Sequence, residues 1–415
     1  MTGQHPDKKS ERTKVLPDGW RWVKLGEVCK IKGGKRLPSG TNFAEHATPY
    51  PYIRVVDFQN GTVKLDDLKH LDEETHKQIK RYIIDRDDVY ISIAGSIGIA
   101  GVITDSLHGA NLTENAARLI IQDKGTLLRD FLALLLRSPI GQESIKLRTN
   151  TVGQPKLALE RISTIEILLP PLPEQKRIVE ILNEQMGAIE KARKAIEAQL
   201  EAAKTLPASY LRAVFNSSEA QQWPRKKLKE VGHFDSGGTP SKENANYWDG
   251  DIPFVTGADI TDFYITKNNA RAFLTYEGLT SGKTAICNEG TLLLVTRTRV
   301  GRVGIAKETM GASQDLSPYN CGPNLIPEYV CRYLINISSE LLSGCRGATI
   351  QGLTRDFISA LEMPYPPLIK QQRIAIQLSE QMASTEKLRQ SLESQLAAIN
   401  ALPAVLLRRA FSGEL

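Results

Sequence analysis

The sequence predicts two mixed α/β (α+β) globular domains in tandem, separated by long α-helices that form an antiparallel coiled coil, with an internal pseudo-two-fold repeat. Three observations lead to this fold class. A long segment occurs twice in the chain, and within each copy the apolar residues recur at helical spacing. Hydrophobic residues make up 41% of the chain and charged residues 24%, so the segments between the helices can bury ordinary cores.

The repeat is clearest from Pro170 to Phe215, which aligns without a gap with Pro366 to Phe411. About half of the positions are identical, which chance does not give over segments of this length. The preceding segments repeat more faintly, since PYIRVVD from Pro51 matches PFVTGAD from Pro253. The similar parts are helical and the diverged parts are globular, so two variable domains share one common frame.

The repeat also sets the expected domain bounds. The polar first residues contain no apolar stretch and are expected to form a loose tail, not a secretion signal. The expected order is a tail over 1–17, a first globular domain over 18–169, a helical segment over 170–215, a second globular domain over 216–365, and a second helical segment with the C-terminus over 366–415.

Each repeated segment has the pattern of one amphipathic helix. The apolar residues follow one another mostly at steps of three and four, and Glu, Gln, Lys and Ala fill most other positions. Pro207 and Pro403 are expected to interrupt the helices near their ends, which leaves some 30 residues that span roughly 45 Å. The stripe includes Ile178, Leu182, Met186, Ile189, Ile196 and Leu200 in the first copy and Ile374, Leu378, Met382, Leu388, Leu392 and Leu396 in the second.

A narrow apolar stripe of this kind needs a partner. Each helix packs either on its own globular domain or along the other helix, and its length favours the second alternative because it overhangs a domain of ~150 residues. If the two ends of the second globular domain lie close together, the helices run antiparallel. Two similar domains roughly 45 Å apart can reach two major-groove faces of DNA about one turn apart. The helices then act as a ruler, and the diverged domains read two different half-sites with an unread gap between them.

The overall composition is compatible with DNA binding but does not require it. The formal charge of +6 suits a polyanionic partner, although many proteins with no nucleic-acid partner are equally basic. The sequence contains no run of about 18 apolar residues that would predict a membrane span. The five cysteines are widely scattered, so neither a zinc site nor a disulfide framework is indicated, and a reducing cytoplasm is expected.

The motif PPLPEQ-x-RI, which opens the first helix, is similar to the helix start in the specificity subunits of type I restriction-modification systems. The order of globular domain, helix, globular domain and helix resembles that family, as does the ending LLRRAFSGEL. The domain openings GWRWVKLGEV and QWPRKKLKEV and the closing segments TVGQPKLALERI and ATIQGLTRDFI are similar as well. The resemblance covers roughly 19–415, and it departs from the family at Ile369 and Lys370, which replace the usual Pro-Glu.

This resemblance implies that each globular domain is a target recognition domain and that the chain is not itself an enzyme. It implies two methyltransferase subunits as partners, which modify adenine N6 with S-adenosylmethionine. Motor-nuclease subunits, which use ATP and Mg, are implied in the full complex. The chain itself is then expected to bind no cofactor or metal, to contact double-stranded DNA in the cytoplasm, and to associate with the nucleoid through that DNA.

Three groups of polar residues are candidates for DNA contact, since Lys and Arg bind phosphates and side chains at base edges give specificity. The glycine pairs, which let a backbone approach a phosphate closely, are accompanied by Lys32, Lys35 and Arg36 in the first copy and by Thr239, Ser241 and Lys242 in the second. A glycine turn carries Arg297, Arg299 and Arg302 in the second copy, where Arg can read guanine, and Ser92 and Ser96 in the first. The closing segments carry Gln154 and Lys156, and Gln351, Thr354 and Arg355. Each of these residues is equally consistent with an ordinary surface or turn position.

Signals of other activities are weak. SGKT from Ser281 lacks the first glycine of a phosphate-binding loop and leads into a turn and a strand, not a helix. The nearest match to an adenine methyltransferase motif, Ser317-Pro318-Tyr319, lacks a proline, and the six histidines have no metal-ligand spacing. A self-contained enzyme and a protein-binding scaffold therefore stay as alternatives. Modification or cleavage of DNA by the chain alone would favour the first, and steep salt dependence of DNA binding would count against the second.

Overall fold

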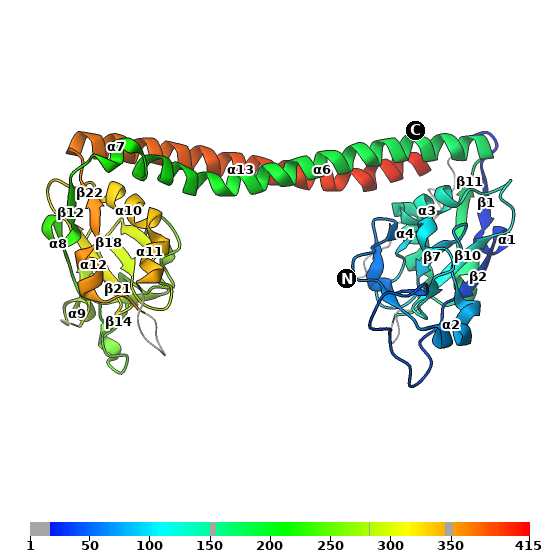
Figure 1. The fold of residues 1–415 in the computed structure, drawn as a ribbon, viewed down its shortest axis with the longest axis horizontal. Helices are drawn as coiled ribbons and strands as arrows, with labels where there is room; N and C mark the ends of the chain where they lie inside the picture. Colours follow the sequence, from blue (N-terminus) through cyan, green and yellow to red (C-terminus); the bar gives the residue numbers. More distant parts are fainter. Residues whose placement is uncertain (1–16, 150–154, 282, 345–351) are drawn as a thin grey trace, which may run out of the picture. The chain divides into compact units, whose positions relative to one another are not determined.

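The computed structural model describes residues 17–149, 155–281, 283–344 and 352–415 (Figure 1). The chain forms two compact units, one comprising Met1–Glu197 with Ser394–Leu415 and the other Ala198–Glu393. Each unit contains one globular domain and parts of both long helices, so each is described by itself.

The first domain is a mixture of short strands and short helices. Its strands are β1 (Arg21–Lys24), β2 (Cys29–Gly33), β3 (Pro51–Ile53), β4 (Phe58–Gln59), β5 (Thr62–Val63), β6 (Lys69–His70), β7 (Val89–Ser92), β8 (Ala100–Val102), β9 (Asn111–Leu112), β10 (Ala116–Ile121) and β11 (Glu166–Leu169). Its helices are α1 (Leu25–Val28), α2 (Glu73–Ile79), α3 (Arg129–Arg137), α4 (Pro139–Arg148) and α5 (Leu159–Ser163), with 3-10 turns η2 (Val55–Asp57), η3 (Lys80–Tyr82) and η4 (Asp105–Leu107).

The main sheet of this domain is antiparallel, in the order β2-β10-β7-β8. A smaller sheet, β6-β3-β9, contains a parallel pair, and β1 pairs with β11 to join the beginning of the domain to its end. Strand β7 is buried on both faces, because Val89 and Ile91 face the core beneath α3 while Tyr90 stacks on Phe58 in the opposite layer. Helix α3 covers the sheet with the buried run FLALLL.

The second domain has the same mixture of elements. Its strands are β12 (Arg225–Lys227), β13 (Gly232–Phe234), β14 (Trp248–Val255), β15 (Tyr264–Ile265), β16 (Ala272–Leu274), β17 (Ala285–Cys287), β18 (Leu292–Val295), β19 (Val303–Ala306), β20 (Met310–Ala312), β21 (Leu316–Cys321) and β22 (Glu362–Pro364). Its helices are α7 (Ser218–Gln221), α8 (Leu228–Val231), α9 (Tyr276–Thr280), α10 (Pro327–Asn336), α11 (Ser338–Ser343) and α12 (Arg355–Ala360), with 3-10 turns η5 (Ala245–Tyr247) and η6 (Lys267–Asn269).

The sheets of the two domains confirm the predicted α+β fold and its internal repeat. The order β13-β21-β18-β19 in the second domain corresponds to β2-β10-β7-β8 in the first, and the parallel pair β14-β20 corresponds to β3-β9. The pair β12-β22 closes the second domain as β1-β11 closes the first. The second domain adds β15 as a parallel edge strand and β17 beside β20, and these additions account for part of its divergence in sequence.

The long helices α6 (Leu172–Phe215) and α13 (Leu368–Phe411) each contain 44 residues, which corresponds to about 66 Å. The expected interruption at Pro207 and Pro403 is wrong, because both prolines lie inside continuous helix. A proline within a helix costs about 3 kcal/mol. The turns beyond Pro207 bury Leu211 and Phe215, and burying two such side chains contributes about 3–6 kcal/mol, which offsets that cost.

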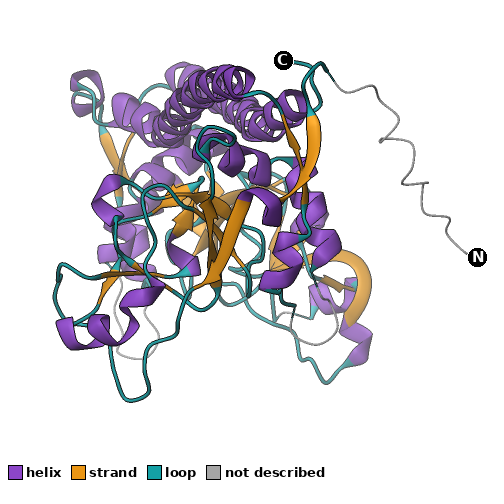
Figure 2. Ribbon diagram, turned by 90° about the vertical axis from the view of Figure 1, so that its right-hand side faces the viewer, coloured by secondary structure: helices purple, strands orange, loops and turns teal. Residues whose placement is uncertain are grey.

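The helices pack together antiparallel within each unit (Figure 1). In the first unit, Ile178 near the start of α6 shares a core with Leu407 and Phe411 near the end of α13. In the second unit, the roles are exchanged, and Phe215 of α6 shares a core with Ile374 of α13. These cores also include the domain beneath, so each helix packs both on a domain and on the other helix. Figure 2 shows the long helices along one side of the strands.

The predicted apolar stripe is buried only in part. Of its members, Ile178, Leu182, Ile196, Ile374, Leu378 and Leu392 are buried, whereas Met186, Ile189, Leu200, Met382 and Leu396 are half-buried. Leu388 is 44% exposed and lies outside the seam. Thr385, the counterpart of Ile189 in the repeat, is 7% exposed and takes the seam position instead. The buried positions along the helices therefore recur at the same places in both repeats, even where one copy has a polar residue at such a position.

Gly187 offers a simple test of the helical frame. It lies in the middle of α6, is exposed, and a Cβ atom added there would meet nothing within 4 Å. The equivalent position in α13 is already alanine, Ala383. Gly187→Ala is therefore expected to raise the free energy of unfolding by about 0.5–1 kcal/mol, measured by urea denaturation. A decrease would mean that this stretch of α6 contacts something through its glycine.

Candidate DNA-binding surface

In the first domain, loops from four separate segments meet at one edge, where β2 and β7 end beside the start of β10. The amide of Lys35 donates to the carbonyl of Leu112 at 2.8 Å. The amide of Ile93 donates to Asn115 at 2.8 Å, and the amide of Leu157 donates to Ile93 at 2.9 Å. Residues 34–36, 93–96, 113–115 and 156–157 together form what we call the loop end of the first domain.

The second domain has an equivalent edge held by equivalent bonds. The amide of Gly238 donates to Ala312 at 2.9 Å, and the amide of Thr296 donates to Asp315 at 2.9 Å. The amide of Leu353 then donates to Thr296 at 2.9 Å. We call residues 237–239, 296–299, 313–315 and 352–353 the loop end of the second domain. In both domains, folding thus brings described residues from each of the three candidate segments to one edge or directly beside it.

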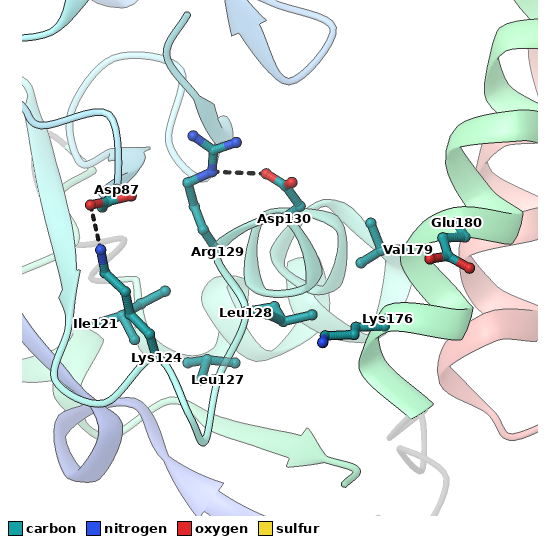
Figure 3. A pocket seen from close by; sticks show the side chains of 10 residues that line it. All are labelled: Asp87, Ile121, Lys124, Leu127, Leu128, Arg129, Asp130, Lys176, Val179 and Glu180. Carbon is teal, nitrogen blue, oxygen red and sulfur yellow. Dashed lines mark hydrogen bonds and ion pairs between the residues drawn. The ribbon is translucent and has the colours of Figure 1, made fainter. Parts of the chain in front are cut away.

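The loop end of the first domain lies at the far end of β7 from helix α6. Before β7 begins, Asp87 borders a cavity of about 290 Å³ at the base of α6 (Figure 3). The acidic and basic groups of this cavity are largely paired with each other, since Lys124 bonds Asp87 at 2.5 Å and Arg129 bonds Asp130 at 2.8 Å. The residues lining the cavity are Asp87, Ile121, Lys124, Leu127, Leu128, Arg129, Asp130, Lys176, Val179 and Glu180.

The glycine pairs have a different role from the one expected. A Cβ atom on Gly34 would lie 2.3 Å from the carbonyl oxygen of Leu112, and one on Gly237 would lie 1.9 Å from that of Ser313. These glycines therefore let two protein backbones approach each other, and the space next to them is filled by protein. The expected approach of a phosphate to these two glycines is not supported.

The cations near the first glycine pair remain accessible. Lys32, Lys35 and Arg36 are all exposed. Arg36 donates to Glu114 at 2.8 Å. Partial burial works to raise the pKa of Glu114, but the hydrogen bonds from Arg36, a backbone amide and Thr113, together with the charge of Arg36, outweigh it, so the pKa of Glu114 is lowered. A DNA phosphate at this position would have to share Arg36 with that carboxylate.

The second copy of this group is less basic. Thr239 is half-buried, whereas Ser241 and Lys242 are exposed. The hydroxyl of Ser241 accepts from the amide of Glu243 at 3.3 Å, and its carbonyl accepts from the indole of Trp248 at 2.9 Å. Lys242 is thus the accessible cation of this segment.

The turn between β7 and β8 contains one residue whose predicted role is contradicted. Ser92 is fully buried, and its hydroxyl donates to the carbonyl of Ser96 at 2.5 Å and accepts from the amide of Ile99 at 2.8 Å. Its side chain therefore closes the turn and is not available to DNA. Ser96 is exposed at the tip of the same turn, beside Gly95, whose φ angle is +72°.

The turn between β18 and β19 carries three exposed arginines, Arg297, Arg299 and Arg302. Within the described part of the chain, their guanidinium groups have no ion pair or side-chain hydrogen bond. Thr298, at the position of Gly95 in the first domain, has a φ angle of +62°. This conformation costs a residue other than glycine about 1–3 kcal/mol, and such strain is concentrated at functional sites.

The closing segments contribute fewer free side chains than expected. Lys156 is exposed and lies opposite Ala94 in an isolated bridge, as Gly352 lies opposite Arg297. Thr354 caps helix α12 by accepting from the amide of Phe357 at 3.3 Å. Arg355 donates to the carbonyl of Asp235 at 2.7 Å and to the hydroxyl of Ser236 at 3.0 Å, so it ties two loops together. Gln154 and Gln351 lie outside the described residues.

Two buried carboxylates at this edge were not predicted from the sequence. Asp57 accepts from the amide of Arg54 at 2.7 Å and from its guanidinium, also at 2.7 Å. Asp259 accepts from the amide of Thr256 at 2.8 Å and from Arg271 at 2.6 Å. Both acids end the repeated motif PYIRVVD or PFVTGAD, so the repeated aspartate was the available signal. Each aspartate holds one arginine, Arg54 or Arg271, next to a loop end, so these arginines are further candidate cations.

Other kinds of site find no support in the described ranges. No three residues among His, Cys, Asp and Glu lie together as a metal site needs. None of the helices in those ranges has both the length and the apolar character needed to cross a membrane.

Comparison with known proteins agrees with this geometry. The family described as type I restriction modification DNA specificity domain matches residues 17–202 and 220–396. The type I restriction enzyme MjaIX specificity subunit of Methanocaldococcus jannaschii is 31% identical over 163 residues, which is 38% of this chain and 38% of that relative. This chain therefore spans less than half the length of that relative in the match. The EcoDI specificity subunit of Escherichia coli is 22% identical over 432 residues, covering 96% of this chain and 89% of the relative.

The fold itself has a solved counterpart. The crystal structure of the HsdS subunit from Thermoanaerobacter tengcongensis matches with a TM-score of 0.69 and 21% identity, covering 98% of this chain and all of that one. Because the family model matches the chain in two long stretches, one for each repeat, this chain belongs to the specificity subunits of type I restriction-modification systems and carries two copies of their DNA specificity domain.

Proposed function

We propose that the two domains read the two halves of an asymmetric, bipartite DNA site for a type I restriction-modification complex, each domain through its loop end. The observation that carries this proposal is that the two loop ends have the same backbone arrangement but present different side chains. Arg297 and Arg299 in the second domain stand where Ala94 and Ser96 stand in the first. A guanidinium can bond O6 and N7 of guanine together, whereas serine contacts bases less selectively, so the half-sites differ.

The long helices are proposed to set the gap between the half-sites. A continuous helix of about 66 Å corresponds to roughly two turns of B-DNA. The helices are also proposed to dock two methyltransferase subunits. Ile369 is 67% exposed and Ile376 is 53% exposed on α13, and both are proposed to lie in this docking surface.

The chain is proposed to perform no covalent chemistry. The adenine methylation, with S-adenosylmethionine, belongs to the methyltransferase subunits, and DNA cleavage, with ATP and Mg, belongs to motor-nuclease subunits. Membership of the specificity family supports this division of labour. In this proposal the chain acts in the cytoplasm, held at the nucleoid through DNA.

The proposal predicts one bipartite motif in a methylome. Coexpression of this chain with its cognate methyltransferase in a host free of such systems is expected to place N6-methyladenine on both strands of a single interrupted sequence. Long-read sequencing of the genomic DNA measures this, and the methyltransferase expressed alone is the control. If both proteins are soluble and associated but no new modification occurs, the proposal fails and a protein-binding scaffold takes its place.

A further inference from the structure

A glutamine occupies the same buried position at the start of both long helices. Gln175 is the fourth residue of α6, Gln371 is the fourth residue of α13, and both have no exposed surface. The two residues that flank each of them in sequence are exposed or half-buried and differ between the repeats, with Glu174 and Lys176 in one and Lys370 and Gln372 in the other.

The side chain of Gln175 joins the helix to the domain through three hydrogen bonds. Its Oε1 accepts from the amide of Leu128 at 2.9 Å, just before helix α3 begins. Its Nε2 donates to the carbonyl of Thr126 at 2.8 Å and to that of Pro170 at 2.9 Å. The loop that leads into α3, the segment that leads into α6, and α6 itself are therefore held by one amide group.

Gln371 makes the same three bonds in the second unit. Its Oε1 accepts from the amide of Ile326 at 3.1 Å, just before helix α10 begins. Its Nε2 donates to the carbonyl of Asn324 at 3.2 Å and to that of Pro366 at 2.9 Å. The bonded loops differ in sequence, so the bonding pattern has been kept while the domains diverged.

A second attachment of each domain is apolar. Phe411 of α13 packs on Phe131 of α3 with ring centroids 5.4 Å apart, and Phe215 of α6 packs on Tyr329 of α10 at 5.4 Å. Apolar contacts are non-directional and allow small rotations, whereas hydrogen bonds weaken steeply away from their preferred angle. The aromatic contact therefore tolerates small changes in the angle of the domain, whereas the glutamine bonds favour one angle.

We propose that Gln175 and Gln371 are positioning residues that set the angle of each reading domain on its helix and thereby the length of the gap in the DNA site. This inference rests on the function proposed above. A domain of this size is roughly 35 Å across, so a tilt of about 5.5° at the helix base moves its far edge by about 3.4 Å. That distance is the rise of one base pair along DNA.

The test uses Gln371→Met in the full methyltransferase complex. Methionine has nearly the same length and volume but makes none of the three bonds. The substrates are plasmids that carry both half-sites with the wild-type gap or with one base pair more or less. The preference for the wild-type gap is expected to fall by roughly tenfold, because the three lost hydrogen bonds no longer hold the domain at one angle, while the bases preferred in each half-site stay the same.

The matched control is Gln372→Met, an exposed neighbour on the same helix, which is expected to keep the wild-type preference. Gln371→Glu retains the acceptor for Ile326 but cannot donate to the two carbonyls, so an intermediate preference is expected. Gln175→Met tests the other domain in the same way.

Unchanged gap preference in both methionine variants would overturn the inference. Failure of both Gln371 variants to form a soluble complex would overturn it as well, because the residue would then serve folding and not angle. The proposed function fails separately, if the wild-type chain directs no bipartite methylation at all.

Discussion

Replacing Phe411 by alanine is expected to lower the stability of the first unit by about 3–5 kcal/mol, the range for deleting a buried aromatic side chain. Phe411 is near the end of the chain, yet it is 1% exposed and lies in the core of the first unit with Phe131 and Ile178. Hydrogen exchange of the amides of α3, followed by mass spectrometry, measures this locally. Their protection is expected to fall by about a hundredfold or more.

Two variants make this expectation specific. Leu402→Ala changes an exposed residue of the same helix, 43% accessible, and is expected to alter protection little. Phe215→Ala is the repeat counterpart, and it is expected to lower protection of α10 in the second unit while leaving α3 unchanged. If either alanine variant lowered the protection of α3 and α10 equally, the assignment of the two helix ends to different units would be contradicted.

Arg299→Ala is expected to relax or abolish recognition of the second half-site and to leave the first half-site intact. Arg299 is exposed at the strained turn of the second loop end and has no ion pair among the described residues. One bidentate Arg–guanine contact contributes about 1–3 kcal/mol of discrimination, so selectivity is expected to fall by roughly 5- to 150-fold. The methylated motif of the variant complex measures the effect base by base.

The control for this result is Arg409→Ala, which removes an exposed arginine from the last turn of α13 and not from a loop end. It is expected to leave both half-sites unchanged. A uniform loss of binding to all sequences in Arg299→Ala, with a shallower salt dependence, would identify Arg299 as a phosphate contact and not a base reader. An unaltered motif would exclude it from the interface.

Much of the fold could be predicted because its signals are local and repeated. The long helices follow from apolar periodicity, and the antiparallel pairing follows from the order of the segments. The helix ends could not be predicted in the same way, since Pro207 was expected to end the helix. Whether a proline is tolerated depends on how much apolar surface the next turns bury, and here Leu211 and Phe215 are buried against the second domain.

The candidate site was predicted less well. Described residues from all three candidate segments do lie at or beside the loop ends. The side chains of Ser92, Thr354 and Arg355, however, are hydrogen-bonded within a turn, a helix cap and a contact between two loops. The sequence does not show whether a polar side chain will form a hydrogen bond with a backbone group of another segment. For the same reason, the roles of Asp57 and Gln175 were not foreseen.

A tandem repeat of mixed α/β domains on paired long helices can be predicted from the amino-acid sequence, because periodicity and self-similarity are properties of the chain alone. Only the folded structure shows which arginines have no partner among the described residues, which polar side chains are hydrogen-bonded within the protein, and how each domain is attached to the helices. These depend on contacts between residues that lie as far apart as Phe131 and Phe411, and such contacts leave no pattern in the intervening sequence.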